Sequence, residues 1–177
     1  MKLIIDASTI HSGGGLEHLK NLIFFLLKKK NIKITIICPY NLQQDLKNFN
    51  VNLILVKRGA INLFLFYFNN KNSFKWDFYL SLNGIFIPKN CSGIIFFHNL
   101  LIFDDNELSR HNYSLFNIKA KLQRLILKYN YNKSKIAIFF SSSSKKIIKE
   151  KIKLNNQKDI IIRHGINEKF YTKKNFI

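Results

Sequence analysis

Short apolar runs alternate with helix-spaced apolar positions along most of the chain. Residues 3–5 form an apolar run that Asp6 ends, and such a run predicts a buried strand. From Leu16 onwards, apolar residues recur at spacings of three and four, which predicts an amphipathic helix. The same patterns predict further strands over residues 32–37, 51–56, 77–82, 93–97, 135–140 and 158–162, and further helices over residues 42–48, 61–68, 112–131 and 141–154.

Strands that alternate with helices are typical of a parallel sheet with crossover connections. We therefore expect an α/β fold, a Rossmann-like parallel sheet with helices on both faces. The 177 residues have room for one domain with a substantial core, and the predicted elements place it over residues 1–162. Residues 163–177 show no periodicity and are predicted to be a linker.

The chain is strongly basic, with a formal net charge of +19. Such a surface attracts polyanions, either nucleic acid or an acidic membrane face. Nucleic-acid binding is disfavoured, because the sequence has no helix-turn-helix, RNP or zinc-finger motif and its phenylalanines lie within apolar runs. No uninterrupted apolar stretch reaches ~18 residues, and the isolated Cys38 and Cys91 suit a reducing compartment. We expect a cytoplasmic protein, free or peripheral at the inner membrane face.

Three consecutive glycines, Gly13, Gly14 and Gly15, end the loop between the first strand and the first helix. Without side chains they let the backbone approach a ligand, and the helix that follows presents unpaired N–H groups to an anion such as phosphate. The run differs from the Gly-x-Gly-x-x-Gly fingerprint, so binding of NAD is disfavoured. The alternative is a flexible turn that binds no ligand.

His98 follows the apolar run at residues 93–97 and is expected at the carboxyl edge of the sheet, where open α/β folds bind their ligands. Its imidazole could transfer a proton or hydrogen-bond a sugar hydroxyl there. A purely structural histidine is the alternative. Asp104 and Asp105 follow closely, but adjacent carboxylates are more typical of a helix start than of a catalytic pair. The histidines and cysteines show no metal-ligand spacing, so no metal is expected.

The helix predicted over residues 112–131 carries two stripes. The apolar stripe consists of Leu115, Ile118, Leu122, Leu125 and Tyr129, and the polar stripe of Asn117, Lys121, Arg124 and Lys128. A charged stripe is usually a solvated face. Beside anionic lipid, each cation could instead contribute about 1 kcal/mol to attachment. Lys121, Arg124 and Lys128 are therefore candidates to face a membrane.

Taken in order, these segments resemble the N-terminal half of family 4 glycosyltransferases. The matching residues are Asp6 with Ser12 and the three glycines, His98 with Asn99, Phe103 with Asp104, the strand that ends at Ser141, and the segment Arg163-His164-Gly165. The resemblance covers essentially the whole chain and does not specify a substrate.

The resemblance implies a GT-B architecture, in which two Rossmann-like domains face each other across a cleft. The N-terminal domain would hold the acceptor, and the C-terminal domain most of the nucleotide-sugar donor. Enzymes of the family retain the anomeric configuration and need neither a metal nor a cofactor besides the donor substrate. Carried over by position, the site residues are Gly13, Gly14 and Gly15 at the donor diphosphate, His98 as the catalytic residue, Asp6, Ser12 and Asn99 as acceptor or sugar contacts, and His164 and Gly165 as the interdomain hinge.

The expected function is transfer of a sugar to a lipid-linked or polysaccharide acceptor in cell-envelope glycan synthesis. The family's glutamate pair and basic phosphate-binding residues belong to the C-terminal domain, which these 177 residues do not include. We therefore expect the chain to be inactive alone, as a truncated product, a fragment of a split gene, or one half that works with a separate C-terminal domain. The alternative is a non-catalytic Rossmann-like module that binds an anion or a partner.

Overall fold

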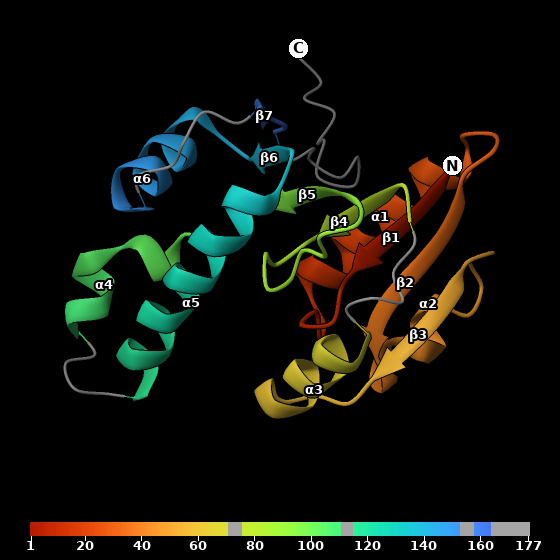
Figure 1. The fold of residues 1–177 in the computed structure, drawn as a ribbon, viewed down its shortest axis with the longest axis horizontal. Coiled ribbons are helices and arrows are strands. Elements are labelled where there is room, and N and C mark those ends of the chain that lie inside the picture. Colours follow the sequence, from red (N-terminus) through yellow and green to blue (C-terminus); the bar gives the residue numbers. More distant parts are fainter. Residues whose placement is uncertain (71–75, 111–114, 153–157, 164–177) are drawn as a thin grey trace, which may run out of the picture.

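Parallel strands form a seven-stranded sheet in the order β3-β2-β1-β4-β5-β6-β7 (Figure 1). The structure is a computed structural model that describes residues 1–70, 76–110, 115–152 and 158–163. Within these ranges the strands are β1 (Lys2–Asp6), β2 (Lys33–Pro39), β3 (Asn52–Val56), β4 (Phe78–Ser81), β5 (Ser92–Phe96), β6 (Ile136–Phe139) and β7 (Lys158–Ile161). The helices are α1 (Gly14–Leu27), α2 (Gln43–Leu46), α3 (Ala60–Asn70), α4 (Asp105–Arg110), α5 (Leu115–Lys133) and α6 (Ser142–Ile152), with 3-10 turns η1 (Tyr40–Leu42) and η2 (Leu101–Phe103).

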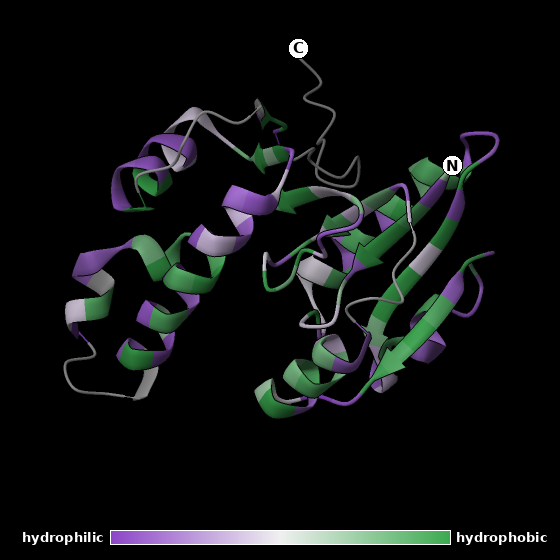
Figure 2. Cartoon of the chain, in the orientation of Figure 1, coloured by the Kyte–Doolittle hydropathy of each residue, from purple (hydrophilic) through white to green (hydrophobic). Residues whose placement is uncertain are grey.

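Helices cover both faces of the sheet. Successive residues of a strand point to opposite faces, so neighbouring residues pack against different helices. Ile5 of β1 lies in a buried cluster with Leu19 of α1. Its neighbour Ile4 lies in a second cluster with Leu63 of α3. A third cluster packs Phe97 against α5 and α6. Figure 2 shows the strands as largely hydrophobic ribbons between these helices. The α/β, Rossmann-like fold predicted from the alternation of elements is confirmed.

The strand order reverses at β1. This strand pairs with β2 on one side and with β4 on the other, and both pairs are parallel. The chain places β2 and β3 on one side of β1 and then crosses back to place β4 to β7 on the other. In open α/β sheets, the crevice at the carboxyl ends of two such strands is the usual ligand site. We therefore expect a ligand site at the carboxyl ends of β1 and β4.

The predicted elements correspond to the observed ones, with differences at their ends. Residues 42–48 form only the short α2 after η1, and α5 extends beyond the predicted end at residue 131. The additional helix α4 begins at Asp105, in the carboxylate pair that the sequence favoured as a helix start. Of the predicted linker, only Arg163 is among the described residues, so the linker stays a prediction.

Asp6, the last residue of β1, carries a buried carboxyl group that joins three elements. Its Oδ2 atom accepts hydrogen bonds from the hydroxyls of Tyr67 in α3 (2.7 Å) and Tyr79 in β4 (2.8 Å). Its Oδ1 atom accepts a hydrogen bond from the N–H of Ser8 (3.1 Å). Burial raises the pKa of Asp6 above its usual value, although these hydrogen bonds oppose the shift. The carboxyl group thereby fixes α3 and β4 to the end of β1.

Replacing Tyr67 by Phe removes one donor to Asp6 and keeps the ring. We expect the free energy of unfolding to fall by about 1–3 kcal/mol, because a buried carboxyl oxygen loses a partner. Tyr129→Phe is the control, since the Tyr129 side chain is exposed on α5, and it should cost less than ~0.5 kcal/mol. Urea denaturation measures both values, and equal stabilities of the two variants would contradict the anchoring role of Asp6.

Candidate functional site

The N-terminus of α1 opens onto the carboxyl edge of the sheet beside β1. Gly13 precedes the helix with φ 65° and ψ −145°, a backbone conformation that residues with side chains rarely adopt. No described side chain caps the helix, so N–H groups of its first turn are available to an anion. A Cβ atom at Gly13 or Gly14 would meet no atom within 4 Å, whereas Gly15 packs beside Ile10. Open space therefore lies in front of this helix end.

His98 lies just beyond the end of β5 and packs against α1. Its ring centroid is 5.1 Å from that of His18 in α1 and 4.6 Å from that of Phe140 after β6. The structure thus brings the helix that follows the glycines and the mid-chain histidine together at one edge of the sheet. His18 was not recognised in the sequence. The available signal was its spacing, because His18 follows Gly14 by four positions and so lies on the same face of the helix.

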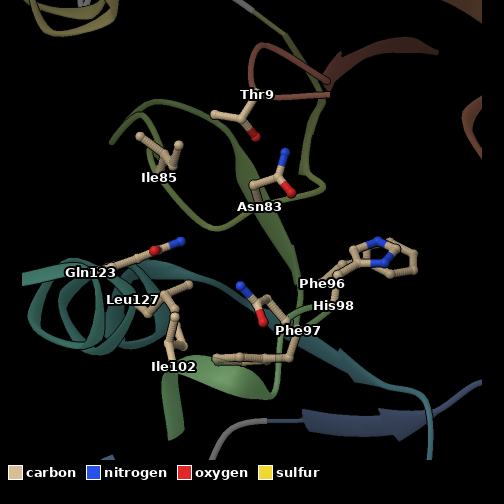
Figure 3. Close-up of a pocket in the computed structure, with 10 residues that line it drawn as sticks. Thr9, Asn83, Ile85, Phe96, Phe97, His98, Ile102, Gln123 and Leu127 are labelled. Atoms are coloured by element: carbon tan, nitrogen blue, oxygen red, sulfur yellow. The ribbon is translucent and has the colours of Figure 1, made fainter. Parts of the chain in front are cut away.

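A cavity of about 250 Å³ lies beside His98, between the carboxyl ends of the strands and α5 (Figure 3). Its polar lining residues are Thr9, Asn83, His98, Asn99 and Gln123, and its apolar lining includes Phe97, Ile102 and Leu127. None of the three glycines lines it. The cavity is therefore separate from the glycine turn at the α1 N-terminus. His98 lines the cavity, and its ring packs on His18 of α1.

The residues predicted to contact the acceptor or sugar lie in different environments. Ser12 is exposed in the loop before the glycines. Asn99 lines the cavity, and its Oδ1 atom accepts a hydrogen bond from the N–H of Leu101 (3.0 Å). Asp6 is a correction, because its carboxyl group is buried and is occupied by the two tyrosine hydroxyls and the Ser8 N–H. The predicted hinge residues, His164 and Gly165, lie outside the described residues.

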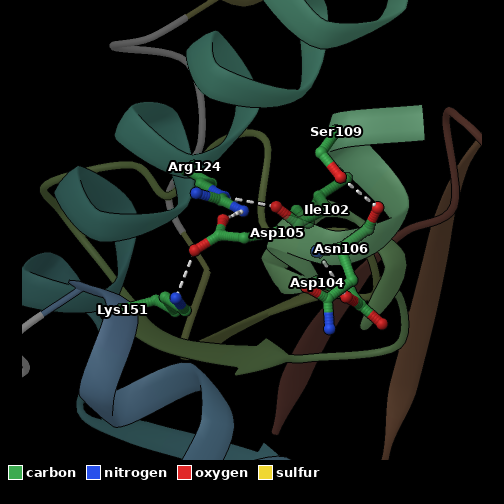
Figure 4. Close-up of polar contacts among 7 residues, drawn as sticks. All are labelled: Ile102, Asp104, Asp105, Asn106, Ser109, Arg124 and Lys151. Atoms are coloured by element: carbon green, nitrogen blue, oxygen red, sulfur yellow. Dashed lines mark hydrogen bonds and ion pairs between the residues drawn. The ribbon is translucent and has the colours of Figure 1, made fainter. Parts of the chain in front are cut away.

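Arg124 is a second correction, because it does not face outward for contact with a membrane. Its guanidinium donates hydrogen bonds to the carboxylate of Asp105 (2.6 Å) and to the backbone oxygen of Ile102, and Lys151 of α6 pairs with the same carboxylate (Figure 4). Lys151 and Arg124 together lower the pKa of Asp105. Arg124 therefore holds α4 and η2 against α5.

The described side chains of the apolar stripe of α5 are exposed. Ile118, Leu122, Leu125 and Tyr129 are each more than half exposed. The buried positions of the helix are Ala120, Leu127, Asn130 and Tyr131. Lys121 is exposed and Lys128 is half-buried. The helix thus packs on the sheet through a stripe that includes a small residue and a carboxamide, and it leaves large apolar side chains in solvent.

The candidate metal ligands and the two thiols of the described residues lie apart or buried. Within these ranges, no group of three or more His, Cys, Asp or Glu side chains is placed to hold a metal ion. Burial raises the pKa of the Cys38 and Cys91 thiols to about 11, so neither is a thiolate nucleophile at neutral pH. None of the helices that the structure describes is long and apolar enough to cross a membrane.

Comparison with known proteins identifies the fold. No protein-family model matches the chain, and no curated protein gives a significant match. Among solved structures, the chain is similar to Alr3699/HepE of Anabaena, whose crystal structure was determined in complex with UDP and glucose. The TM-score is 0.60 at 12% sequence identity, over 97% of this chain and 46% of that chain. The likeness shows a shared α/β, Rossmann-like fold, and this chain spans less than half of the neighbour's length.

Gly13 and Gly14 are expected to respond differently to substitution. Gly13→Ala should lower the free energy of unfolding by about 1–3 kcal/mol, because alanine is strained at this positive φ. Gly14→Ala should change it by less than ~1 kcal/mol, because Gly14 is helical and has open space around its Cα atom. Thermal and urea unfolding of both variants provide the measurement. A Gly13→Ala variant as stable as Gly14→Ala would show that the loop does not need the observed backbone conformation.

Proposed function

We propose that the chain is the acceptor-side half of a GT-B glycosyltransferase that uses a nucleotide-sugar donor. One observation carries the proposal: helix α1, whose N-terminus has no side-chain cap, packs through His18 against His98 at the carboxyl edge of the sheet, next to the point where the strand order reverses. The shared fold with the Anabaena protein, solved with UDP and glucose, supports it. The order of sequence segments that resembles family 4 glycosyltransferases supports it independently.

In the proposed reaction, the bond between the anomeric carbon and the donor phosphate oxygen breaks, and a bond to an acceptor hydroxyl oxygen forms. Negative charge develops on the leaving diphosphate while the sugar gains oxocarbenium character. The N–H groups of Gly14 and Gly15 and the dipole of α1 would stabilise that diphosphate. His98 would hydrogen-bond a hydroxyl of the reacting sugar. We propose that the anomeric configuration is retained and that no metal takes part.

Transfer would need a second domain that binds most of the donor. The chain aligns with 46% of the Anabaena neighbour, which supports an enzyme in which these residues form one wall of a cleft. We propose that the donor domain forms the other wall, from the same polypeptide or from a separate one. In the proposed arrangement, the 177 residues alone do not transfer sugar.

We propose that the acceptor is lipid-linked or a polysaccharide of the cell envelope, and that α5 contacts the inner face of the cytoplasmic membrane. The support is the exposed apolar stripe of α5, in a helix that also contains Lys119, Lys121, Lys128 and Lys133. Large exposed apolar side chains beside lysines are typical of a helix that lies in a membrane interface. Helix α3 also exposes large apolar side chains, Ile61, Phe64, Leu65 and Phe68, but contains no Lys or Arg.

Binding of UDP to the chain tests the donor site. We expect NMR titration to detect UDP binding and Gly14→Asp to weaken it at least ~tenfold, because an added carboxylate at the helix N-terminus repels the diphosphate. Aspartate is favourable at that end of a helix, so the fold should persist. Lys30→Gln is the control, because it removes the same amount of net charge beyond the opposite end of α1.

An equal loss of UDP affinity in both variants would mean that binding reflects only the overall positive charge of the chain. A wild-type chain that binds no UDP would favour the alternative, a Rossmann-like module that binds a partner without catalysis.

Binding to lipid vesicles tests the membrane contact. The double variant Leu122→Gln/Leu125→Gln should bind phosphatidylglycerol vesicles at least ~tenfold more weakly than the wild type, since two exposed apolar side chains no longer enter the interface. The control is Ile61→Gln/Phe64→Gln, which removes equally exposed apolar side chains from α3 and should leave binding unchanged in a sedimentation assay. Equal weakening by both double variants would show that α5 is not the contact surface.

A further inference from the structure

The cavity beside His98 has an uncharged polar lining. Its polar groups are the hydroxyl of Thr9, the carboxamides of Asn83, Asn99 and Gln123, and the imidazole of His98. The other five lining residues are apolar or aromatic. The chain carries 29 Lys and Arg residues and 10 Asp and Glu residues, yet none of the described lining residues is among them. The cavity therefore differs in character from the strongly basic chain as a whole.

Polar groups reach the cavity from four separate segments. Thr9 follows β1, Asn83 follows β4, Asn99 follows β5, and Gln123 belongs to α5. Figure 3 shows Thr9 and Asn83 on one side of a common space and Gln123 and Leu127 on the other. Such convergence of a few polar groups on an otherwise apolar cavity is typical of small-molecule sites.

The turn that carries Asn83 is fixed to α5. Buried Asn130 donates hydrogen bonds from its Nδ2 atom to the backbone oxygens of Gly84 (2.8 Å) and Ile85 (2.7 Å). Gly84 has φ 66°, and a Cβ atom there would overlap Leu127 of α5, so only glycine permits this close approach. The backbone position of Asn83 relative to α5 is therefore set before any ligand binds.

The side-chain amide nitrogen of Asn83 has no hydrogen-bond acceptor among the described residues. This Nδ2 atom is buried. A buried donor without a partner is unfavourable, and such groups usually pair with a bound molecule or an ordered water.

Carboxamides and hydroxyls match the hydroxyl groups of a sugar, because each can both donate and accept hydrogen bonds. The apolar surface of Phe97, Ile102 and Leu127 matches the C–H groups of a sugar ring. The described lining contains no Lys or Arg that would neutralise a carboxylate or a phosphate, and burying such a group beside a neutral imidazole, without a cationic partner, is costly. The volume of about 250 Å³ lies below the ~300–1,000 Å³ of sites for drug-sized ligands, which suits a single sugar ring.

We infer that the cavity binds one uncharged sugar unit, and that uronic acids and phosphorylated sugars are excluded from it. The assignment of this unit to the acceptor rests on the proposed glycosyltransferase function. A sugar bound there contacts the carboxamides of Asn83 and Gln123 and places a hydroxyl beside His98.

The test is NMR titration of the 177-residue chain with methyl glucoside, methyl glucuronide and glucose 6-phosphate, followed through side-chain amide resonances. The neutral glycoside should shift the amide signals of Asn83 and Gln123, and the two anionic sugars should not. The contrast is sharp, because a net charge of +19 by itself favours the anionic sugars. Gln123→Met should weaken methyl glucoside binding about tenfold, whereas Gln44→Met on the exposed surface of α2 should not.

Each other outcome has a definite meaning. Binding of methyl glucuronide at this site as tight as that of methyl glucoside would overturn the exclusion of charged sugars. Loss of glycoside binding in both methionine variants would remove Gln123 from the site. Absence of glycoside binding in a chain that binds UDP would overturn the cavity assignment and leave the proposed function intact. Glycoside binding in a chain that does not bind UDP would support the cavity and count against the donor site.

Discussion

The buried carboxyl group of Asp6 is the constraint on which the site depends. It receives the hydroxyls of Tyr67 and Tyr79 and so joins α3 and β4 to the carboxyl end of β1. This junction lies where the strand order reverses. The loop from β1 to α1 consequently starts from a fixed point, and the helix N-terminus opens at the same edge of the sheet as His98. Asp6, which the sequence suggested as a ligand contact, instead holds α3 and β4 at this edge of the sheet.

Two features with different electrostatics lie at this edge. At the N-terminus of α1, backbone N–H groups and the helix dipole favour an anion. In the cavity, carboxamides and a hydroxyl favour an uncharged polar ligand. His98 lines the cavity, and its ring lies against His18 of α1. In the proposed function, the first feature would hold the donor phosphates and the second the acceptor.

The sequence predicted the strands well, because a strand buried on both faces, such as residues 3–5, consists of consecutive apolar residues. Such a run is recognised without knowing which strands or helices pack against it. It predicted the site less well, because burial depends on residues far away in the chain. Asp6 is paired by tyrosines 61 and 73 positions later. In α5, the inward stripe includes Ala120 and Asn130, which no hydrophobicity pattern marks as core. Arg124 of α5 is held by Asp105 of α4 and Ile102 of η2, contacts between elements that the sequence pattern does not indicate.

The exposed side chains Leu122 and Leu125 of α5 have a consequence for the protein in concentrated solution. Like-charged copies of a strongly cationic chain repel one another at low ionic strength, which keeps these apolar surfaces apart. Added salt shortens the reach of that repulsion to about 10 Å at 0.1 M without weakening the attraction between apolar surfaces. Colloidal stability should therefore be highest at low ionic strength, and raising the salt concentration should promote self-association through this helix.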